Sequence, residues 1–333
     1  GHYITDRQVA FLAPDLSKAS LRRFYLLPKV HKPQSTWPHP SMPAGRPIVS
    51  DCGSESYNIC KYINYYLRPL TIKHNSYIKD TYHFVQKVKN APVRPTHLLV
   101  TGDITSLYTN MHIDKILDAV RKLFHKYPDK NRPDDALLKL LHITLTHNDF
   151  VFAGKLFLQI LGVAMGRSYA PSTADAYMIE FDEKAQQGGY ILDLYSRFLD
   201  DIFFLFEGTL QQVKQLEDYL NTLIPDIHIT LTANTEICHF LDVYVYKHYD
   251  CNGNCTLQTR TYFKPTDTHQ LLHTHSYHPK HTFSAIIRSQ FIRFKRLSST
   301  FEDYKSSSQI LTAVLRTRGY SRRLINKTKR DIW

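Results

Sequence analysis

The sequence has few cysteines and no hydrophobic run long enough to cross a membrane. Its 333 residues include five cysteines, an odd and sparse set that predicts reduced thiols and an intracellular protein. No signal peptide is visible, and the chain opens on Gly1 without an initiator methionine, so we expect a piece of a longer product. The sequence has no internal repeat and no low-complexity linker. Its length allows either one large or two ordinary domains. Without a membrane-spanning run, we expect no membrane partner.

Acidic residues are also in the minority. The chain has 42 Lys and Arg against 30 Asp and Glu, a net charge of +12, together with 22 Tyr and 18 Phe. Positive charge with many aromatic side chains suits a polyanion whose bases can stack on protein rings. The composition therefore favours nucleic acid over a membrane surface as the partner. Basic charge by itself is a weak indication, because many soluble proteins are basic.

Metal-binding clusters of cysteine and histidine are not evident. Cys251 and Cys255 bracket Asn252-Gly253, which is typical of a hairpin turn, and a zinc site would need two further ligands at suitable spacing. We therefore expect a β-hairpin here. The tail holds five histidines whose spacing matches no ordinary structural zinc site, so we expect them on a surface near nucleic acid: His269, His273, His275, His278 and His281.

An acid pair, Asp200-Asp201, stands inside an almost unbroken run of large apolar residues at 195–206. An unpaired charge in such surroundings would cost several kcal/mol of desolvation. The run is rich in aromatic and β-branched residues, which predicts two buried strands with the acids at or near the turn between them. A second pair, Asp134-Asp135, follows a proline and is typical of a solvated helix N-terminus. Only the first pair is therefore a candidate metal site.

Hydrophobic periodicity predicts a mixture of helices and strands along the chain. Strands are expected at 98–104, 228–232 and 240–246, with a hairpin at 150–160 and a basic strand-loop-strand flap formed by 24–32 and 45–50. Helices are expected at 57–67, where Pro69 should end the helix, from about His112, at 135–147, from Pro171 to 188–189, and after the capping residue Thr209.

Asp103 closes the strand at 98–104, far in sequence from the acid pair, so only folding can bring the three acids together. Carboxylates a few ångströms apart repel by about 4 kcal/mol per pair at an effective dielectric of about 20, a penalty that divalent cations would remove. Oxygen donors in this number favour Mg²⁺, which takes its remaining ligands from water and substrate phosphates. Two such ions clamp both oxygens of a phosphoryl transfer, and Lys29 and Arg46 of the flap could hold a triphosphate.

Six segments come in the order found in the reverse transcriptases of Penelope-like retroelements, and the chain resembles that family over nearly its whole length. The segments are 24–32, 45–50, the Asp103 strand, Met165-Gly166, 198–201 and 240–243. Two further stretches of the tail, 264–268 and 273–279, are similar to the family's segment leading into the thumb.

The resemblance implies an α+β right-hand polymerase with fingers, palm and thumb, and with an antiparallel palm sheet packed on helices. Fingers with an N-terminal extension would occupy 1–97, the palm with inserted finger and palm helices 98–250, and a hairpin with a thumb-like helical region 251–333. The implied activity is RNA-directed DNA polymerase, a nucleotidyltransferase that extends a DNA primer on an RNA template with dNTPs. Nuclear location follows from the family's chromosomal target.

The resemblance also assigns the metal site. Asp103, Asp200 and Asp201 would be the catalytic, metal-binding acids, with the backbone carbonyl of Ile104 as a further ligand. The cofactor would be two Mg²⁺ ions, with Mn²⁺ as a substitute.

Other residues would bind the incoming nucleotide. Lys29 and Arg46 would contact its phosphates, and Met165-Gly166 would lie in the same nucleotide site. Tyr108, five residues past the first acid, falls where these enzymes place an aromatic steric gate that excludes a 2′-hydroxyl. Without the family frame, Tyr108 reads as a core tyrosine.

Departures from the wider reverse-transcriptase pattern leave alternatives open. Ala170 stands where a serine is usual, and Phe198 stands where many relatives have tyrosine. No GIY-YIG endonuclease is seen after the tail, so nicking activity is not expected of this chain. The alternatives are a telomerase-like or RNA-synthesising polymerase, and a catalytically inactive remnant that binds nucleic acid. Oligomeric state and template preference are not predicted.

Overall fold

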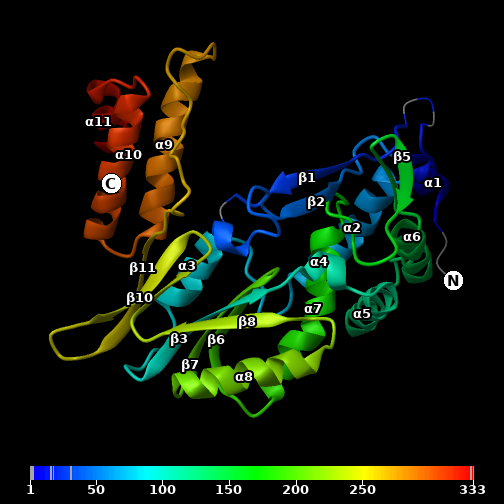
Figure 1. Ribbon diagram of the computed structural model, residues 1–333, viewed down its shortest axis with the longest axis horizontal. Coiled ribbons are helices and arrows are strands. Elements are labelled where there is room, and N and C mark those ends of the chain that lie inside the picture. Colours follow the sequence, from blue (N-terminus) through cyan, green and yellow to red (C-terminus); the bar gives the residue numbers. More distant parts are fainter. Residues whose placement is uncertain (1–3, 16, 18, 31, 331, 333) are drawn as a thin grey trace. The chain divides into compact units, whose positions relative to one another are not determined.

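The computed structural model describes residues 4–15, 17, 19–30, 32–330 and 332 (Figure 1). His31 of the predicted flap and the outermost positions of the two predicted end domains lie outside the described residues. The helices are α1 (Asp6–Leu12), α2 (Tyr57–Thr71), α3 (Thr81–Lys89), α4 (Leu107–Asn110), α5 (Ile113–Lys126), α6 (Asp134–Thr146), α7 (Ala170–Gln187), α8 (Leu210–Leu223), α9 (Lys280–Leu297), α10 (Phe301–Thr317) and α11 (Arg322–Arg330), with a 3₁₀ turn η1 (Gln34–Thr36).

The strands alternate with these helices along the chain. They are β1 (Phe24–Pro28), β2 (Gly45–Val49), β3 (His97–Ile104), β4 (Asp149–Phe152), β5 (Lys155–Leu158), β6 (Leu192–Phe198), β7 (Asp201–Glu207), β8 (Ile229–Asn234), β9 (Ile237–Phe240), β10 (Val243–Tyr249) and β11 (Cys255–Thr261). Among the described residues, no helix is long and apolar enough to span a bilayer.

The chain divides into two compact units, each assembled from several segments. The first contains residues 1–77, 103–190 and 214–230, and the second contains 78–102, 191–213 and 231–333. The predicted division into 1–97, 98–250 and 251–333 stays a prediction.

The first unit consists of packed helices and two hairpins. Helix α5 packs on α6 and α7, and α2 packs on the same two helices. Helix α5 is amphipathic and buries Ile116, Val120 and Phe124 on one face, as its periodicity predicts. Antiparallel β1–β2 confirms the expected flap, and β4–β5 confirms the expected hairpin. The Phe24 ring stacks on the Phe150 ring at 5.4 Å, which joins the two hairpins.

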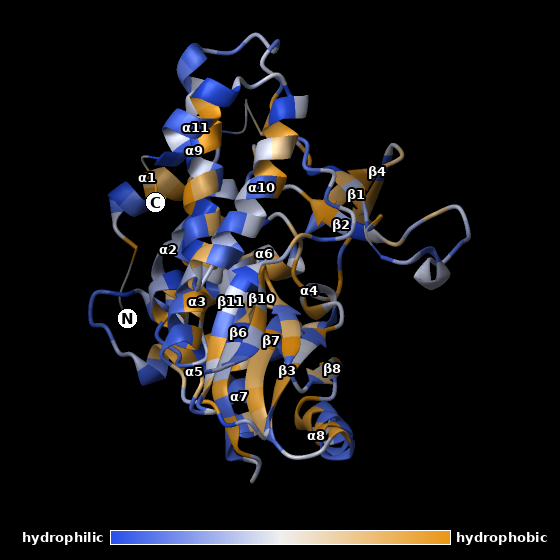
Figure 2. Cartoon of the chain, turned by 90° about the vertical axis from the view of Figure 1, so that its left-hand side faces the viewer, coloured by the Kyte–Doolittle hydropathy of each residue, from blue (hydrophilic) through white to orange (hydrophobic). Residues whose placement is uncertain are grey.

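The second unit is built around β-sheets. A four-stranded sheet has the order β6-β7-β3-β8, with most of its residues in this unit, and a three-stranded sheet has the order β11-β10-β9. Apolar residues concentrate along β7 (Figure 2). Phe84 of α3 contacts the rings of Phe203 and Phe240 at 5.0 and 4.6 Å, so one helix covers residues of both sheets. Helices α9, α10 and α11 form a separate apolar cluster that includes Phe291 and Tyr304.

Two predictions made from short sequence motifs at the ends of helices and strands are confirmed. Gln212 N donates to Thr209 Oγ1 at 3.2 Å, and Thr209 N donates to the Gln212 side chain at 2.8 Å, which confirms Thr209 as the cap of α8 through a capping box. The Asn-Gly hairpin between β10 and β11 is confirmed, with Gly253 at φ +79°.

Two predicted boundaries are wrong. Helix α2 runs through Pro69 to Thr71, because a proline in the last turn removes only one intrahelical donor and the buried Leu70 and Thr71 keep the chain packed. The strand expected at 240–246 is two strands, since the chain reverses at Leu241-Asp242 between β9 and β10.

Leu205→Ala should lower the free energy of unfolding by about 2–5 kcal/mol, because this β7 side chain is fully buried in the core. Leu210→Ala makes the same change at a position that is 61% exposed, and it should cost less than about 0.5 kcal/mol. Equilibrium urea denaturation followed by circular dichroism measures both. Equal losses in the two variants would contradict the placement of β7 in the core.

Candidate active site

The acid pair lies at a tight turn between two antiparallel strands. Phe198 pairs with Asp201, which leaves Leu199 and Asp200 as a two-residue turn between β6 and β7. Leu199 has φ +56°, a left-handed conformation that costs a side-chain-bearing residue about 1–2 kcal/mol. The buried Arg197 donates from Nη1 to the Leu199 carbonyl at 3.2 Å and so supports the turn. The predicted strand-turn-strand is confirmed.

The acid pair lies at the edge of the apolar core. Asp200 and Asp201 are half-buried, whereas Ile202, Phe203 and Phe204 directly after them are completely buried. The turn carries the two carboxylates to the edge of the apolar core, so their desolvation penalty is smaller than the sequence alone indicates.

Asp103 is the penultimate residue of β3, as predicted. Strand β3 is the neighbour of β7 in the four-stranded sheet. The Asp103 side chain is exposed, while that of Ile104 is buried. Asp103 belongs to the first unit and the Asp200-Asp201 pair to the second. Within the part of the chain that the structure describes, no three His, Cys, Asp or Glu side chains form a group able to hold a metal ion.

The two predicted phosphate-binding residues lie on the β1–β2 hairpin of the first unit. Arg46 is exposed on β2 opposite Leu27, and Lys29 follows β1, where its amide donates to the Ala44 carbonyl at 2.8 Å. Residues paired across antiparallel strands share a face, and so do residues two apart in one strand. The register therefore places Lys29 and Arg46 on the same face of the hairpin.

The Met165-Gly166 segment is held against the same hairpin. Val49 at the end of β2 donates its amide to the Met165 carbonyl at 3.0 Å. Gly166 has φ +146°, and a Cβ there would lie 2.2 Å from the Val49 carbonyl oxygen. Only glycine fits such a close approach. The structure thus joins the loop that contains Met165 and Gly166 to the strand that carries Arg46.

Tyr108 contacts the same loop through its backbone. It lies in the short helix α4, half-buried, and its carbonyl accepts a hydrogen bond from Val163 N at 2.7 Å. Gly162, at φ +78°, passes so close that a Cβ would lie 2.4 Å from the Tyr108 oxygen. The 161–168 loop therefore lies against both β2 and α4.

An apolar hollow of about 380 Å³ opens beside this loop. Its lining combines residues of both hairpins with the loop itself, including Pro47, Val49, Phe150, Leu161, Val163 and Met165. Met165 is thus the one predicted nucleotide-binding residue that lines it.

Three buried charged residues next to the loop were not found by sequence reasoning. Arg22, Asp51 and Arg167 are 2%, 1% and 3% exposed. Asp51 accepts from Arg22 Nε at 3.1 Å, and Arg167 Nη1 lies 3.4 Å from the same carboxylate. The sequence feature that could have pointed to one of them is the place of Arg167 directly after Met165-Gly166.

Hydroxyl groups complete this cluster. Ser54 and Ser56 donate to Asp51 at 2.7 and 2.8 Å. Burial by itself raises the pKa of Asp51, but the Arg167 guanidinium and the hydrogen bonds from Ser54, Cys60 and Ser56 outweigh it, so the pKa of Asp51 lies below its ordinary value. The cluster therefore contains an ionised carboxylate.

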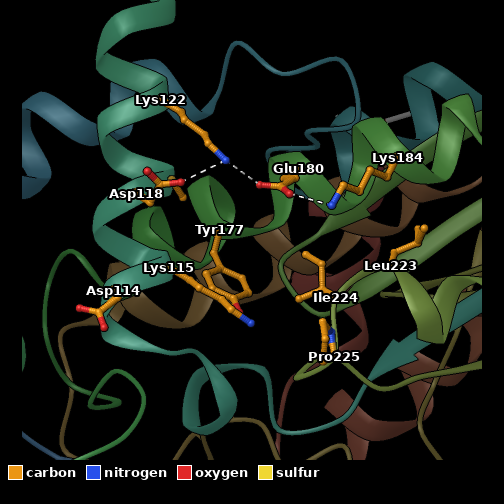
Figure 3. Close-up of a pocket in the computed structure, with 11 residues that line it drawn as sticks. Asp114, Lys115, Asp118, Lys122, Tyr177, Glu180, Lys184, Leu223, Ile224 and Pro225 are labelled. Carbon is orange, nitrogen blue, oxygen red and sulfur yellow. Dashed lines mark hydrogen bonds and ion pairs between the residues drawn. The ribbon is translucent and has the colours of Figure 1, made fainter.

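A second hollow in the first unit, of about 500 Å³, contains none of the predicted site residues (Figure 3). Its lysines are neutralised by neighbouring acids: Lys122 lies between Asp118 and Glu180, at 3.1 and 3.0 Å, and Lys184 pairs with Glu180 at 2.7 Å. With its positive charges paired in this way, the hollow has no excess positive charge for a phosphate.

Comparisons with known proteins support a polymerase fold. The telomerase of Candida albicans in complex with a fragment of telomeric RNA is 10% identical, with a TM-score of 0.58 over 92% of this chain and 57% of that chain. The RNA-dependent RNA polymerase of a human picorbirnavirus is 11% identical, with a TM-score of 0.60 over 90% and 58%. The apo telomerase of Candida tropicalis is 11% identical, with a TM-score of 0.54 over 93% and 59%.

The sequence comparisons cover less of the chain. Residues 270–330 match the family model described as an animal helix-turn-helix domain. No curated protein sequence matches. The chain spans a little over half the length of the solved structures it resembles. It has the mixed α+β, right-hand polymerase fold of the telomerase and viral RNA polymerase structures, which confirms the predicted fold class.

Gly162→Ala and Gly154→Ala test the loop contact as a matched pair. Both glycines have nearly the same φ, +78° and +76°, but nothing lies within 4 Å of a Cβ at Gly154. Gly154→Ala should cost about 1–2 kcal/mol from its φ alone. Gly162→Ala should cost at least about 1 kcal/mol more, because its methyl meets the Tyr108 carbonyl. Equal losses in urea denaturation would contradict the close approach.

Proposed function

We propose that this chain is the RNA-directed DNA polymerase of a Penelope-like retroelement. The observation that carries the proposal is the polymerase fold combined with acids at the two expected places, Asp103 at the end of β3 and Asp200-Asp201 at the β6–β7 turn. A fold alone does not fix a reaction, so the acids carry the chemical part of the argument.

In this proposal Asp103, Asp200, Asp201 and the Ile104 carbonyl would hold two magnesium ions. The donor chemistry fits, because carboxylate and carbonyl oxygens are the ligands that Mg²⁺ prefers. When bound, the ions would supply Lewis-acid stabilisation of a phosphoryl transfer. The partial exposure of the Asp200-Asp201 pair is consistent with acids that meet a substrate.

The incoming dNTP would be bound by residues of the first unit. Lys29 and Arg46, on one face of the β1–β2 hairpin, would contact its phosphates, since Arg is suited to bidentate phosphate contacts. Met165-Gly166 would lie beside it, and the Tyr108 ring would exclude a ribose 2′-hydroxyl. The loop contacts that join β2 to α4 support this shared role.

An RNA template and a DNA primer would be the other partners. A net charge of +12 suits a polyanion, and the helix-turn-helix match covers α9, α10 and α11, which lie within residues 270–330. A nuclear location belongs to the same proposal.

A second candidate is an RNA-synthesising or telomerase-like polymerase. The observation that favours it is the likeness to a viral RNA-dependent RNA polymerase, with a TM-score of 0.60, and to telomerases. Sugar selection separates an RNA-synthesising enzyme from a reverse transcriptase, because only the former prefers ribonucleotides.

Asp200→Asn should lower primer extension by at least about a hundredfold, because it removes a charged metal ligand with little change in shape. Primer extension on an RNA template with Mg²⁺ and dNTPs measures this. Asp135→Asn is the matched control, since it neutralises an exposed acid at the start of α6, and it should extend like the parent. No extension by the parent, or equal extension by Asp200→Asn, would overturn the proposal.

Tyr108→Ala should raise incorporation of ribonucleotides relative to deoxynucleotides by about tenfold or more, because the gate is removed. Single-nucleotide extension with each nucleotide type gives the ratio. Tyr65→Ala removes a tyrosine that is 73% exposed on α2, and it should leave the ratio unchanged. Unchanged sugar selection in the Tyr108 variant would refute the gate. Preference of the parent for ribonucleotides would favour the second candidate.

A further inference from the structure

A cluster of buried charges lies at the base of the β1–β2 hairpin. We call Arg22, Asp51, Ser56 and Arg167 the anchor cluster. The Ser56 hydroxyl is its centre: it accepts from Arg22 Nη2 and from Arg167 Nη1, both at 2.8 Å, and donates to Asp51 at 2.8 Å. All four residues belong to the first unit and are at least 95% buried.

The cluster joins three segments that are distant in sequence. Arg22 stands two residues before β1, Asp51 stands two residues after β2, and Arg167 directly follows Gly166. The base of each hairpin strand and the end of the 161–168 loop are therefore tied to one carboxylate. The hydrogen bond from the Val49 amide to the Met165 carbonyl lies next to these attachments. Val49 is two residues before Asp51, and Met165 is two residues before Arg167.

Further hydrogen bonds orient the two guanidinium groups. Arg22 Nη1 donates to the Asp149 side chain and carbonyl at 3.1 and 3.2 Å. Arg167 Nη2 donates to Asn148 Oδ1 at 3.0 Å, and Arg167 Nη1 also reaches Cys60 Sγ at 3.2 Å. Both arginines thus contact the start of the β4–β5 hairpin as well.

Stability is a weak reason for such an arrangement. Replacing a buried ion pair by well-packed apolar residues is often neutral or stabilising, because desolvation offsets the attraction. A planar guanidinium with several satisfied hydrogen bonds instead fixes direction and distance. The anchor cluster is accordingly suited to hold the loop and the hairpin in one mutual geometry.

We propose that Arg167, acting through Ser56 and Asp51, is a positioning residue that holds Met165-Gly166 against β2, so that the loop and Arg46 meet the same nucleotide. The inference rests on the proposed polymerase function for its consequence in kinetics, but its structural part is independent of it.

The location of the cluster predicts which kinetic constant changes. The anchor cluster holds the base of the β1–β2 hairpin, which carries Lys29 and Arg46, and the residue that follows Gly166. Of the proposed metal-binding acids, Asp103 shares the first unit with the cluster, and Asp200 and Asp201 are in the second unit. Loss of the anchor should therefore weaken nucleotide binding and leave the chemical step nearly unchanged. In kinetic terms, KM for the dNTP rises while kcat stays close to that of the parent.

Arg167→Lys and Ser56→Ala are the test variants. The first keeps the positive charge and loses the forked hydrogen bonds, and the second removes only the shared hydroxyl, so it introduces no new charge. Each should raise KM for the dNTP by about tenfold, the effect of losing one charge-assisted hydrogen bond, with kcat changed less than about threefold. Arg132→Lys is the matched control, because Arg132 is equally buried, at 3%, and paired with Asp134 but is no part of the cluster.

Hydrogen exchange gives a readout that needs no activity. The Val49 amide should lose protection against exchange by about tenfold in both test variants, because they weaken its hydrogen bond to the Met165 carbonyl. In Arg132→Lys this hydrogen bond is kept, so the amide should stay protected. A parent protein without extension activity would refute the proposed function. The exchange of the Val49 amide would then still test whether the anchor cluster positions the loop. Unchanged Val49 protection in both folded test variants, or the same KM rise in Arg132→Lys, would overturn the inference.

Discussion

The first unit depends on the passage of one loop between two backbone segments. At Gly162 the loop approaches the Tyr108 carbonyl, and at Gly166 it approaches the Val49 carbonyl, each so closely that a Cβ would lie within 2.4 Å of oxygen. These approaches leave no room for side chains, so hydrogen bonds from Val163 and Val49 can form in their place. The hairpin with Arg46, the short helix α4 and the loop consequently share one geometry.

The second unit contains two similar turns with a strained backbone. Phe198-Leu199-Asp200 and Phe240-Leu241-Asp242 both form two-residue hairpin turns, with leucine at φ +56° and +52°. Such strain persists where surrounding structure over-determines it. Asp242 lies 3.3 Å from Arg293 of α9, so its turn is tied to the C-terminal helices. The tripeptide Phe-Leu-Asp thus occurs at two turns. One contributes the first acid of the Asp200-Asp201 pair, and the other attaches the β9–β10 turn to α9.

Much of the local structure was predictable from the sequence, because the signals lie within a few residues of one another. The β6–β7 strands follow from the apolar run, α5 from its periodicity, and the cap of α8 from Thr209. The predictions failed where context overrides local preference. Helix α2 continues past Pro69 because its last turn is buried, and the 240–246 strand is broken by a turn in which leucine, not glycine, adopts positive φ.

The sequence by itself determined the polymerase fold class, and it supplied Asp103, Asp200-Asp201 and the residues of the nucleotide side as candidates, since these depend on residue type and order along the chain. Tertiary structure alone decided how exposed the acid pair is, and it joined the 161–168 loop to β2 and α4. It also decided that Arg22, Asp51 and Arg167 belong together. The physical reason is distance along the chain: a buried ion pair between residues more than a hundred positions apart leaves no periodic or local signal, and only folding creates the burial that gives it strength.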